Sequence, residues 1–378
     1  MKKKHSLLMS TALTYFVLLT MFILVRLSFL YVKIESETAL KFFDLGMNIL
    51  VQVGVMFLLP VLMFSNLRKQ SPKKTLSDFG YSPISAKSIF ICIILGFLCY
   101  FLNLFIASFF SSIIHFCGYE DIPSYSYSTS SGNYSVGAFL LQVFLVAVLP
   151  AICEETTHRG LLLKGLSSMG MVKAVVLSSI FFGLMHMNIS QFFYATVLGF
   201  IIALSVVISR SIVPGMIIHF MNNFLSTYFT FARANKWVGS KFNEFVYGFL
   251  FGGSSMLGHL VSVVLSLTVI LGLIIYLFVV LLKETRIKKV QKMLSEIQAM
   301  NSEISSFPQS FGGNSNLLNL HFLNRLMNEY NIKGLESMIF TDLEQKPVKS
   351  STFEKVCLAS CFVLGILVTI STFAWGIL

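Results

Sequence analysis

The residues best suited to chemistry are charged and polar side chains that interrupt long apolar stretches. Glu154 and Glu155 follow a run from 122 to 153 that contains no charge, and Arg159 comes four residues after Glu155. Residues four apart on a helix share a face, so Glu155 and Arg159 can pair, which holds Glu155 ionised. Glu154 then points elsewhere and is the better candidate for catalysis.

Two histidines and an asparagine occupy similar surroundings. His186 is the only histidine between residues 174 and 209, a stretch without Asp, Glu, Lys or Arg. His219 and Asn223 are four apart in another apolar stretch and therefore share a helix face. A carboxylate and an imidazole in a low-dielectric cavity can activate water, while a second imidazole and a carboxamide donate hydrogen bonds to a tetrahedral oxyanion.

A metal mechanism would use the same side chains. Glu154, His186 and His219 can ligate a divalent metal such as zinc, because two histidines and a carboxylate form a common catalytic set. His158 is an additional candidate ligand, although the usual His-Glu-x-x-His signature is absent. A serine or cysteine mechanism is less favoured: no serine has a Gly-x-Ser-x-Gly setting, and Cys153 adjoins Glu154, which opposes thiolate formation. The cofactor stays open between none and zinc.

The elements that must position these residues are membrane helices. Of the 378 residues, 55% are hydrophobic and 12% are charged, against roughly a quarter charged in an ordinary soluble domain. We expect an all-α polytopic membrane protein with about eight to nine transmembrane helices and a small cytosolic helical segment, since a span needs roughly 20 apolar residues. The apolar runs lie at 6–32, 43–65, 88–116, 138–166, 172–187, 190–209, 212–231, 245–282 and 356–378.

Helix geometry predicts that the candidate residues meet. Measured from the nearest cation on the same helix, at about 1.5 Å per residue, Glu154 and His219 lie roughly 15 Å away and His186 and Asn223 roughly 20 Å away. All four are expected at similar depth, near the middle of the membrane. The structural alternative is that the histidines and Asn223 only support helix packing and that the two glutamates and Arg159 form a salt-bridged helix end.

Loop charges predict the orientation. Five basic clusters, beginning with Lys2 to Lys4, alternate with weakly basic or acidic loops, which places the N-terminus and these clusters in the cytosol of a multi-pass cell-membrane protein. Because the net charge of +11 is concentrated beside spans, nucleic-acid binding is not expected.

The chain divides into five expected regions. They are additional N-terminal transmembrane helices at 1–66, a core at 67–240 that carries the candidate residues, one or more further helices at 241–282, a cytosolic helical segment at 283–350 and a C-terminal transmembrane helix at 351–378. Gly252 to Ser255 can break the eighth apolar run into two helices. The segment 283–350 carries nine Lys/Arg and seven Asp/Glu, and its pattern predicts a helix at 288–304 and an amphipathic helix at 317–326. It is a candidate cytosolic helical subdomain, partner-docking arm or interfacial element.

Three motifs follow one another in successive apolar stretches. They are Glu-Glu-x-x-x-Arg at 154–159, Phe-x-x-x-His at 182–186 and His-x-x-x-Asn at 219–223. In this order they resemble the CPBP (Abi) family of intramembrane proteases, which includes type II CAAX prenyl endopeptidases and bacterial bacteriocin-processing or self-immunity proteins. The resemblance covers residues 75–231.

The resemblance implies an intramembrane endopeptidase that cuts a membrane-embedded peptide or protein. It assigns water activation to Glu154 and His186, oxyanion stabilisation to His219 and Asn223, and support of the site to Glu155 and Arg159. Family members have been described both as metal-dependent and as metal-independent glutamate proteases. The alternatives are a non-enzymatic immunity or scaffold membrane protein, and a transporter in which the buried Glu154 carries protons.

Overall fold

The computed structural model describes residues 6–31, 34, 36–119, 134–251, 256–305 and 350–377. Within these ranges every regular element is a helix, so the all-α polytopic class is confirmed. Its first helices are α1 (Leu7–Tyr31), α2 (Glu37–Ile49), the π-helix η1 (Leu50–Leu58), α3 (Leu59–Arg68), α4 (Pro72–Phe79) and α5 (Ala86–Phe116).

A single long span follows α5 and carries the first motif. It consists of α6 (Val136–Gln142), the π-helix η2 (Val143–Val148), α7 (Leu149–Glu155), the π-helix η3 (Thr156–Leu163), α8 (Lys164–Leu166) and the 3₁₀ turn η4 (Ser167–Met169). The remaining helices are α9 (Met171–Met185), α10 (Ile189–Ser209), α11 (Val213–Asn235), α12 (Ser240–Phe251), α13 (Met256–Ser305) and α16 (Thr352–Ile377).

Seven helices among the described residues are long and apolar enough to cross a membrane. Two expected spans, α9 and α11, are not among the seven. α9 is only 15 residues long, and α11, at 23 residues, carries His219, Asn222 and Asn223. The eighth apolar run, for which the sequence left one or two helices open, forms two, with α12 ending at Phe251 and α13 beginning at Met256.

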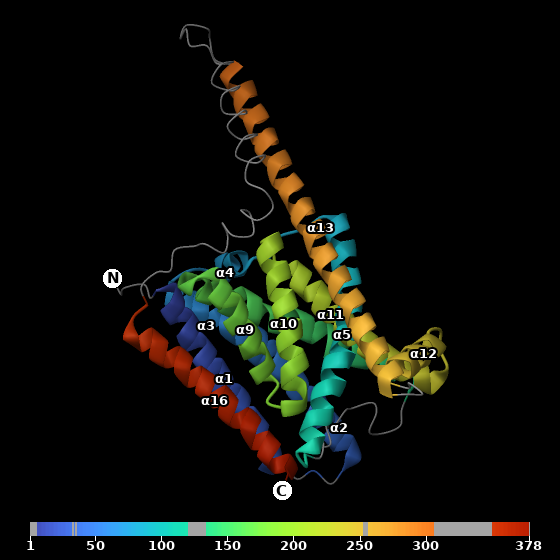
Figure 1. Ribbon diagram of the computed structural model, residues 1–378. Coiled ribbons are helices and arrows are strands. Elements are labelled where there is room, and N and C mark those ends of the chain that lie inside the picture. The colour runs from blue at the N-terminus through green and yellow to red at the C-terminus, as the bar shows by residue number, and fades with distance from the viewer. Residues whose placement is uncertain are drawn as a thin grey trace.

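The helices pack into one bundle around α5, α9, α10 and α11. α10 lies against α9, α5 and α11, and α11 also packs along α5 and on η2. The N- and C-terminal helices α1 and α16 lie side by side along one edge of the bundle (Figure 1). α5 and α11 approach closely because Gly96 faces α11: a Cβ at this position would lie 2.5 Å from Cβ of Met221. Small residues at such contacts are typical of helix packing in membranes.

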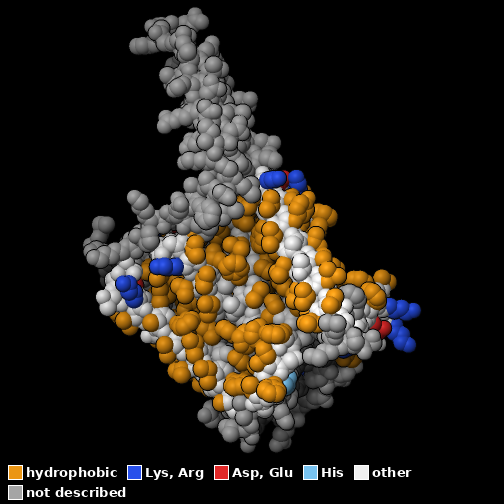
Figure 2. Space-filling view, in the orientation of Figure 1, with side chains coloured by type: hydrophobic (Ala, Val, Ile, Leu, Met, Phe, Trp, Pro, Cys, Tyr) orange, Lys and Arg blue, Asp and Glu red, His pale blue; other side chains and the backbone are white. Residues whose placement is uncertain are grey.

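The outer surface suits a lipid environment. Hydrophobic side chains cover most of the face shown in Figure 2, with the visible lysines and arginines at its margins. Large apolar residues such as Phe90, Phe109 and Ile275 are 63% exposed. Apolar area of this extent marks contact with a membrane or a partner.

α13 is much longer than a membrane span. Its 50 residues extend about 75 Å, against about 30 Å for the hydrocarbon core. Its distal end projects beyond the other helices (Figure 1). The expected helix at 288–304 is therefore confirmed as the end of α13, while the amphipathic helix expected at 317–326 lies outside the described residues.

Candidate active site

The two adjacent glutamates lie at the end of α7, between two π-helical segments. η2 ends at Val148, directly before the first residue of α7, and η3 begins at Thr156, directly after Glu155. π-helical turns within α-helices occur frequently at functional sites. The wider turns are stabilised in part by a neighbouring element, because the hydroxyl of Thr157 donates to the carbonyl oxygen of Met56 in η1.

Glu155 is buried between Arg159 and His219. Its Oε2 lies 3.2 Å from Nε of Arg159, and its Oε1 lies 2.9 Å from Nδ1 of His219. Neither Glu155 nor Arg159 exposes any of its side chain. The expected pairing of Glu155 with Arg159 is thus confirmed, and Glu155 also holds the imidazole of α11. Since Nδ1 of His219 donates to the carboxylate, Nε2 is the ring atom directed at other groups.

The ring of Phe182 in α9 packs against three histidines. Its ring centroid lies 5.0 Å from that of His158, 5.2 Å from that of His186 and 5.5 Å from that of His219, each edge-on. The guanidinium carbon of Arg159 lies 4.7 Å from the same centroid, in cation–π range. The helices that carry the three motifs, α7–η3, α9 and α11, therefore contribute side chains to one cluster around Phe182. This is consistent with the similar depth expected for the candidate residues.

His186 caps the C-terminal end of α9. Its Nδ1 lies 2.9 Å from the carbonyl oxygen of Phe182. A carbonyl oxygen only accepts, so Nδ1 carries the proton and the lone pair of the neutral ring is on Nε2. The next residue, Met187, has φ +48° and is buried. A non-glycine residue in this region is strained, and such strain is concentrated at functional sites.

Glu154 has a partner that the motifs do not include. Nε2 of Gln52, in η1, donates to its Oε1 at 2.9 Å. Residues 1–66 were expected to lie outside the protease core, yet this helix reaches the candidate carboxylate. The signal in the sequence is that Gln52 is a polar residue within a charge-free run, where polar side chains are costly.

Asn223 is oriented by a chain of three carboxamides. Asn103 donates to Oδ1 of Asn222 at 2.8 Å, and Asn222 donates to Oδ1 of Asn223 at 2.9 Å. Nδ2 of Asn223 then donates to the carbonyl oxygen of Val146, in η2, at 2.8 Å. The chain ends on a carbonyl, which only accepts, so the direction of every donation is fixed. Nδ2 of Asn223 retains a second N–H that can donate elsewhere.

The candidate metal ligands do not form a preassembled set. Across the described part of the chain, no three side chains of His, Cys, Asp or Glu are grouped closely enough to hold one metal ion. His158, the additional candidate, uses Nδ1 for the carbonyl oxygen of Glu154 at 2.9 Å, and its ring is buried against Phe182. The donor set therefore does not fit a preformed zinc site, and no metal enters the chemistry below. The zinc alternative stays a prediction that metal analysis tests.

Comparison with known proteins bears on residues 136–225. This region, which runs from the start of α6 into α11 and contains all three motifs, matches the family model described as type II CAAX prenyl endopeptidase Rce1-like. No curated protein and no solved structure matches the chain. The cluster built by the three motifs lies within the matched region, so residues 136–225 are similar to the type II CAAX prenyl endopeptidases in both sequence and motif arrangement, which supports the expected resemblance to the CPBP family.

Proposed function

We propose that the protein is an intramembrane endopeptidase that hydrolyses a peptide bond of a membrane-associated peptide or protein. The observation that carries this proposal is the pairing of Nδ1 of His219 with Glu155 at 2.9 Å, on the ring of Phe182 that also packs against His186. It supports a division of labour in which Glu155 and Arg159 position groups and Glu154 does the chemistry.

Water activation is assigned to Glu154 and His186. Gln52 holds one oxygen of the Glu154 carboxylate. In the proposed reaction the other oxygen takes a proton from water, while Nε2 of His186 accepts the second water hydrogen and orients the nucleophile. The hydroxide adds to the scissile carbonyl, and when the C–N bond breaks the proton on Glu154 passes to the leaving amine.

Oxyanion stabilisation is assigned to His219 and Asn223. Because Nδ1 of His219 donates to Glu155, the ring can donate from Nε2 only as an imidazolium. Asn223 uses one N–H for the carbonyl oxygen of Val146 and offers the second to the oxyanion. Fixed donors of this kind contribute because they need no reorganisation as charge develops.

The test compares Glu154→Gln with wild type in a host membrane. New peptide termini in the membrane fraction are identified by mass spectrometry, and a peptide that spans a cleavage position is then assayed with purified protein in lipid nanodiscs. We expect cleavage to be lost in Glu154→Gln and His186→Ala. The matched control is Glu284→Gln on α13, whose carboxylate pairs with Lys87 away from the cluster. Wild-type cleavage by Glu154→Gln refutes the proposal.

A further inference from the structure

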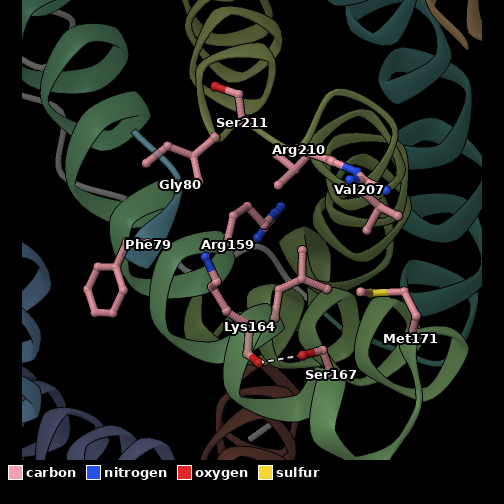
Figure 3. Close-up of a pocket in the computed structure, with 12 residues that line it drawn as sticks. Phe79, Gly80, Arg159, Lys164, Ser167, Met171, Val207, Arg210 and Ser211 are labelled. Atoms are coloured by element: carbon pink, nitrogen blue, oxygen red, sulfur yellow. Dashed lines mark hydrogen bonds between the residues drawn. The ribbon is translucent and has the colours of Figure 1, made fainter. Parts of the chain in front are cut away.

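A cavity of about 330 Å³ opens at the helix ends beside the candidate active site. It is enclosed by the loop after α4, by η3 to η4, and by the turn that joins α10 to α11 (Figure 3). Its volume lies in the range of small-molecule sites. Arg159, which pairs with Glu155 in the site, also lines this cavity, so the two spaces share one side chain.

The charged residues that line the cavity are all cationic, although the carboxylate of Asp78 lies close enough to interact with Lys164. Arg159, Lys164 and Arg210 line it, and none of the lining residues is acidic. Arg159 forms the buried floor and is 1% exposed, whereas Lys164 and Arg210 are exposed at the mouth. Figure 3 shows the three side chains around the same hollow.

Arg159, at the floor of the cavity, lacks hydrogen-bond acceptors for part of its guanidinium group. Nη2 of Arg159 donates to the carbonyl oxygen of Gly199 at 3.3 Å, and Nε lies 3.2 Å from Glu155 without the alignment of a hydrogen bond. Nη1 has no hydrogen-bond partner, although it is buried. A buried donor without an acceptor costs free energy, particularly on a charged group. An oxyanion in the cavity would supply the missing acceptor, since guanidinium groups bind carboxylates and phosphates strongly.

Most of the remaining lining residues are apolar. Phe79, Met171 and Val207 are among them, and Ser167 and Ser211 add two hydroxyl groups. The cavity lies at the ends of two candidate spans, beside Lys164 to Ser167 and beside Arg210, where lipid headgroups would adjoin it. A ligand that fills it would combine an anionic group with an apolar body.

We propose that this cavity binds the phosphate group of an anionic amphiphile, with Arg159 at its floor and Lys164 and Arg210 at its mouth. The ligand chemistry is a phosphate oxyanion, and a phospholipid headgroup is the source that the apolar wall favours over free phosphate. Because Arg159 also pairs with Glu155, a ligand bound here contacts the positioning network of the candidate active site without entering it.

Ligand binding can be measured without a cleavage assay, by the rise in thermal stability of purified full-length protein in detergent micelles. The probes are dihexanoylphosphatidylglycerol, the uncharged dihexanoylglycerol and inorganic phosphate. We expect a concentration-dependent rise with the phospholipid, a rise only at much higher concentration with inorganic phosphate, and none with dihexanoylglycerol. This test measures ligand binding only, so its result does not depend on whether the protein is a protease.

The variant Lys164→Gln/Arg210→Gln tests the residues. Both side chains are exposed, so the protein should fold, and loss of two charge-assisted contacts should weaken phospholipid binding by about tenfold or more. Lys173→Gln is the matched control, because Lys173 is an exposed cation of α9 that does not line the cavity. Unchanged affinity in the double variant, or equal binding of dihexanoylglycerol, overturns the proposal. Equal affinity for inorganic phosphate overturns the lipid source and leaves a site for soluble phosphate.

Discussion

Replacing Glu155 by glutamine tests the positioning network most directly. In wild type the carboxylate is the common partner of Arg159 and His219, and neither Glu155 nor Arg159 exposes any side-chain surface. The amide of Glu155→Gln keeps the shape but removes the charge. Arg159 is then left as a buried cation that retains the carbonyl oxygen of Gly199, the ring of Phe182 and a weaker electrostatic interaction with the Glu154 carboxylate.

Removing one member of a buried ion pair typically costs about 3–5 kcal/mol, and we expect a loss of this size in the free energy of unfolding. The assay is equilibrium unfolding in mixed micelles, followed by circular dichroism. Glu154→Gln is the matched control one residue earlier: its amide oxygen can still accept from Gln52, so its stability should change by less than about 1 kcal/mol.

A second substitution separates charge from shape. In Glu155→Gln/Arg159→Met the unpaired cation is gone, so this protein should be more stable than Glu155→Gln alone. Glu155→Gln should also lower kcat by about 10²–10³, because His219 loses the carboxylate that accepts from its Nδ1 and holds the ring in position to stabilise the oxyanion. Stability of Glu155→Gln equal to wild type would refute the reasoning, since it would mean that the buried guanidinium needs no carboxylate.

Three further predictions follow from the described residues. In Gly215→Ala the new Cβ would lie 3.0 Å from Oε2 of Glu155 and 2.9 Å from Cγ2 of a neighbouring isoleucine, so both stability and cleavage should fall. The control is Gly272→Ala, whose new Cβ has nothing within 4 Å and which should be neutral in the same assays. Burial raises the pKa of Asp78, but hydrogen bonds from Lys74 and a nearby glutamine outweigh it and hold the pKa below its usual value. Asp78 therefore stabilises the fold above about pH 4, and this stabilisation is lost as the pH falls through its lowered pKa. In thermal unfolding, Asp78→Asn should lack this part of the decrease in stability at acid pH. If its stability depends on pH as that of wild type does, the lowered pKa of Asp78 is contradicted. Because the described donors form no preassembled metal set, cleavage should persist in chelator and metal analysis should find less than one equivalent of bound zinc; full inhibition that zinc reverses would contradict the metal-free reaction.

Local sequence rules predicted the parts of the site that depend on short separations. Helix periodicity placed Glu155 and Arg159 on one face, and counting residues along each apolar run placed His186 and His219 at a common depth. The structure contains the 3.2 Å contact of the first pair and the packing of both histidines on Phe182. The helix at 288–304 also followed from pattern alone, whereas the division of the eighth apolar run was left open by the sequence.

Contacts between distant residues could not be predicted in this way. Gln52 and Glu154 are separated by 102 positions, and no periodicity relates them. The sequence identified Phe182 as the first residue of the Phe-x-x-x-His motif. Its packing against three imidazoles and a guanidinium could not be predicted, because it depends on how several helices cross. The π-helices were missed because the choice between hydrogen bonds to the fourth and the fifth preceding residue depends on tertiary contacts, such as that of Thr157 with Met56.

The two π-helices that flank α7 set the rotational orientation of the span that carries Glu154, the candidate catalytic carboxylate. An α-helix advances by 100° per residue, and a π-helix advances by less, so η2 and η3 rotate Glu154 and Glu155 relative to both ends of the same span. A one-residue insertion or deletion inside either π-helix would therefore act as a rotation of the carboxylate pair rather than as a change in span length. The rest of the bundle could keep its packing while Glu154 turned away from Gln52.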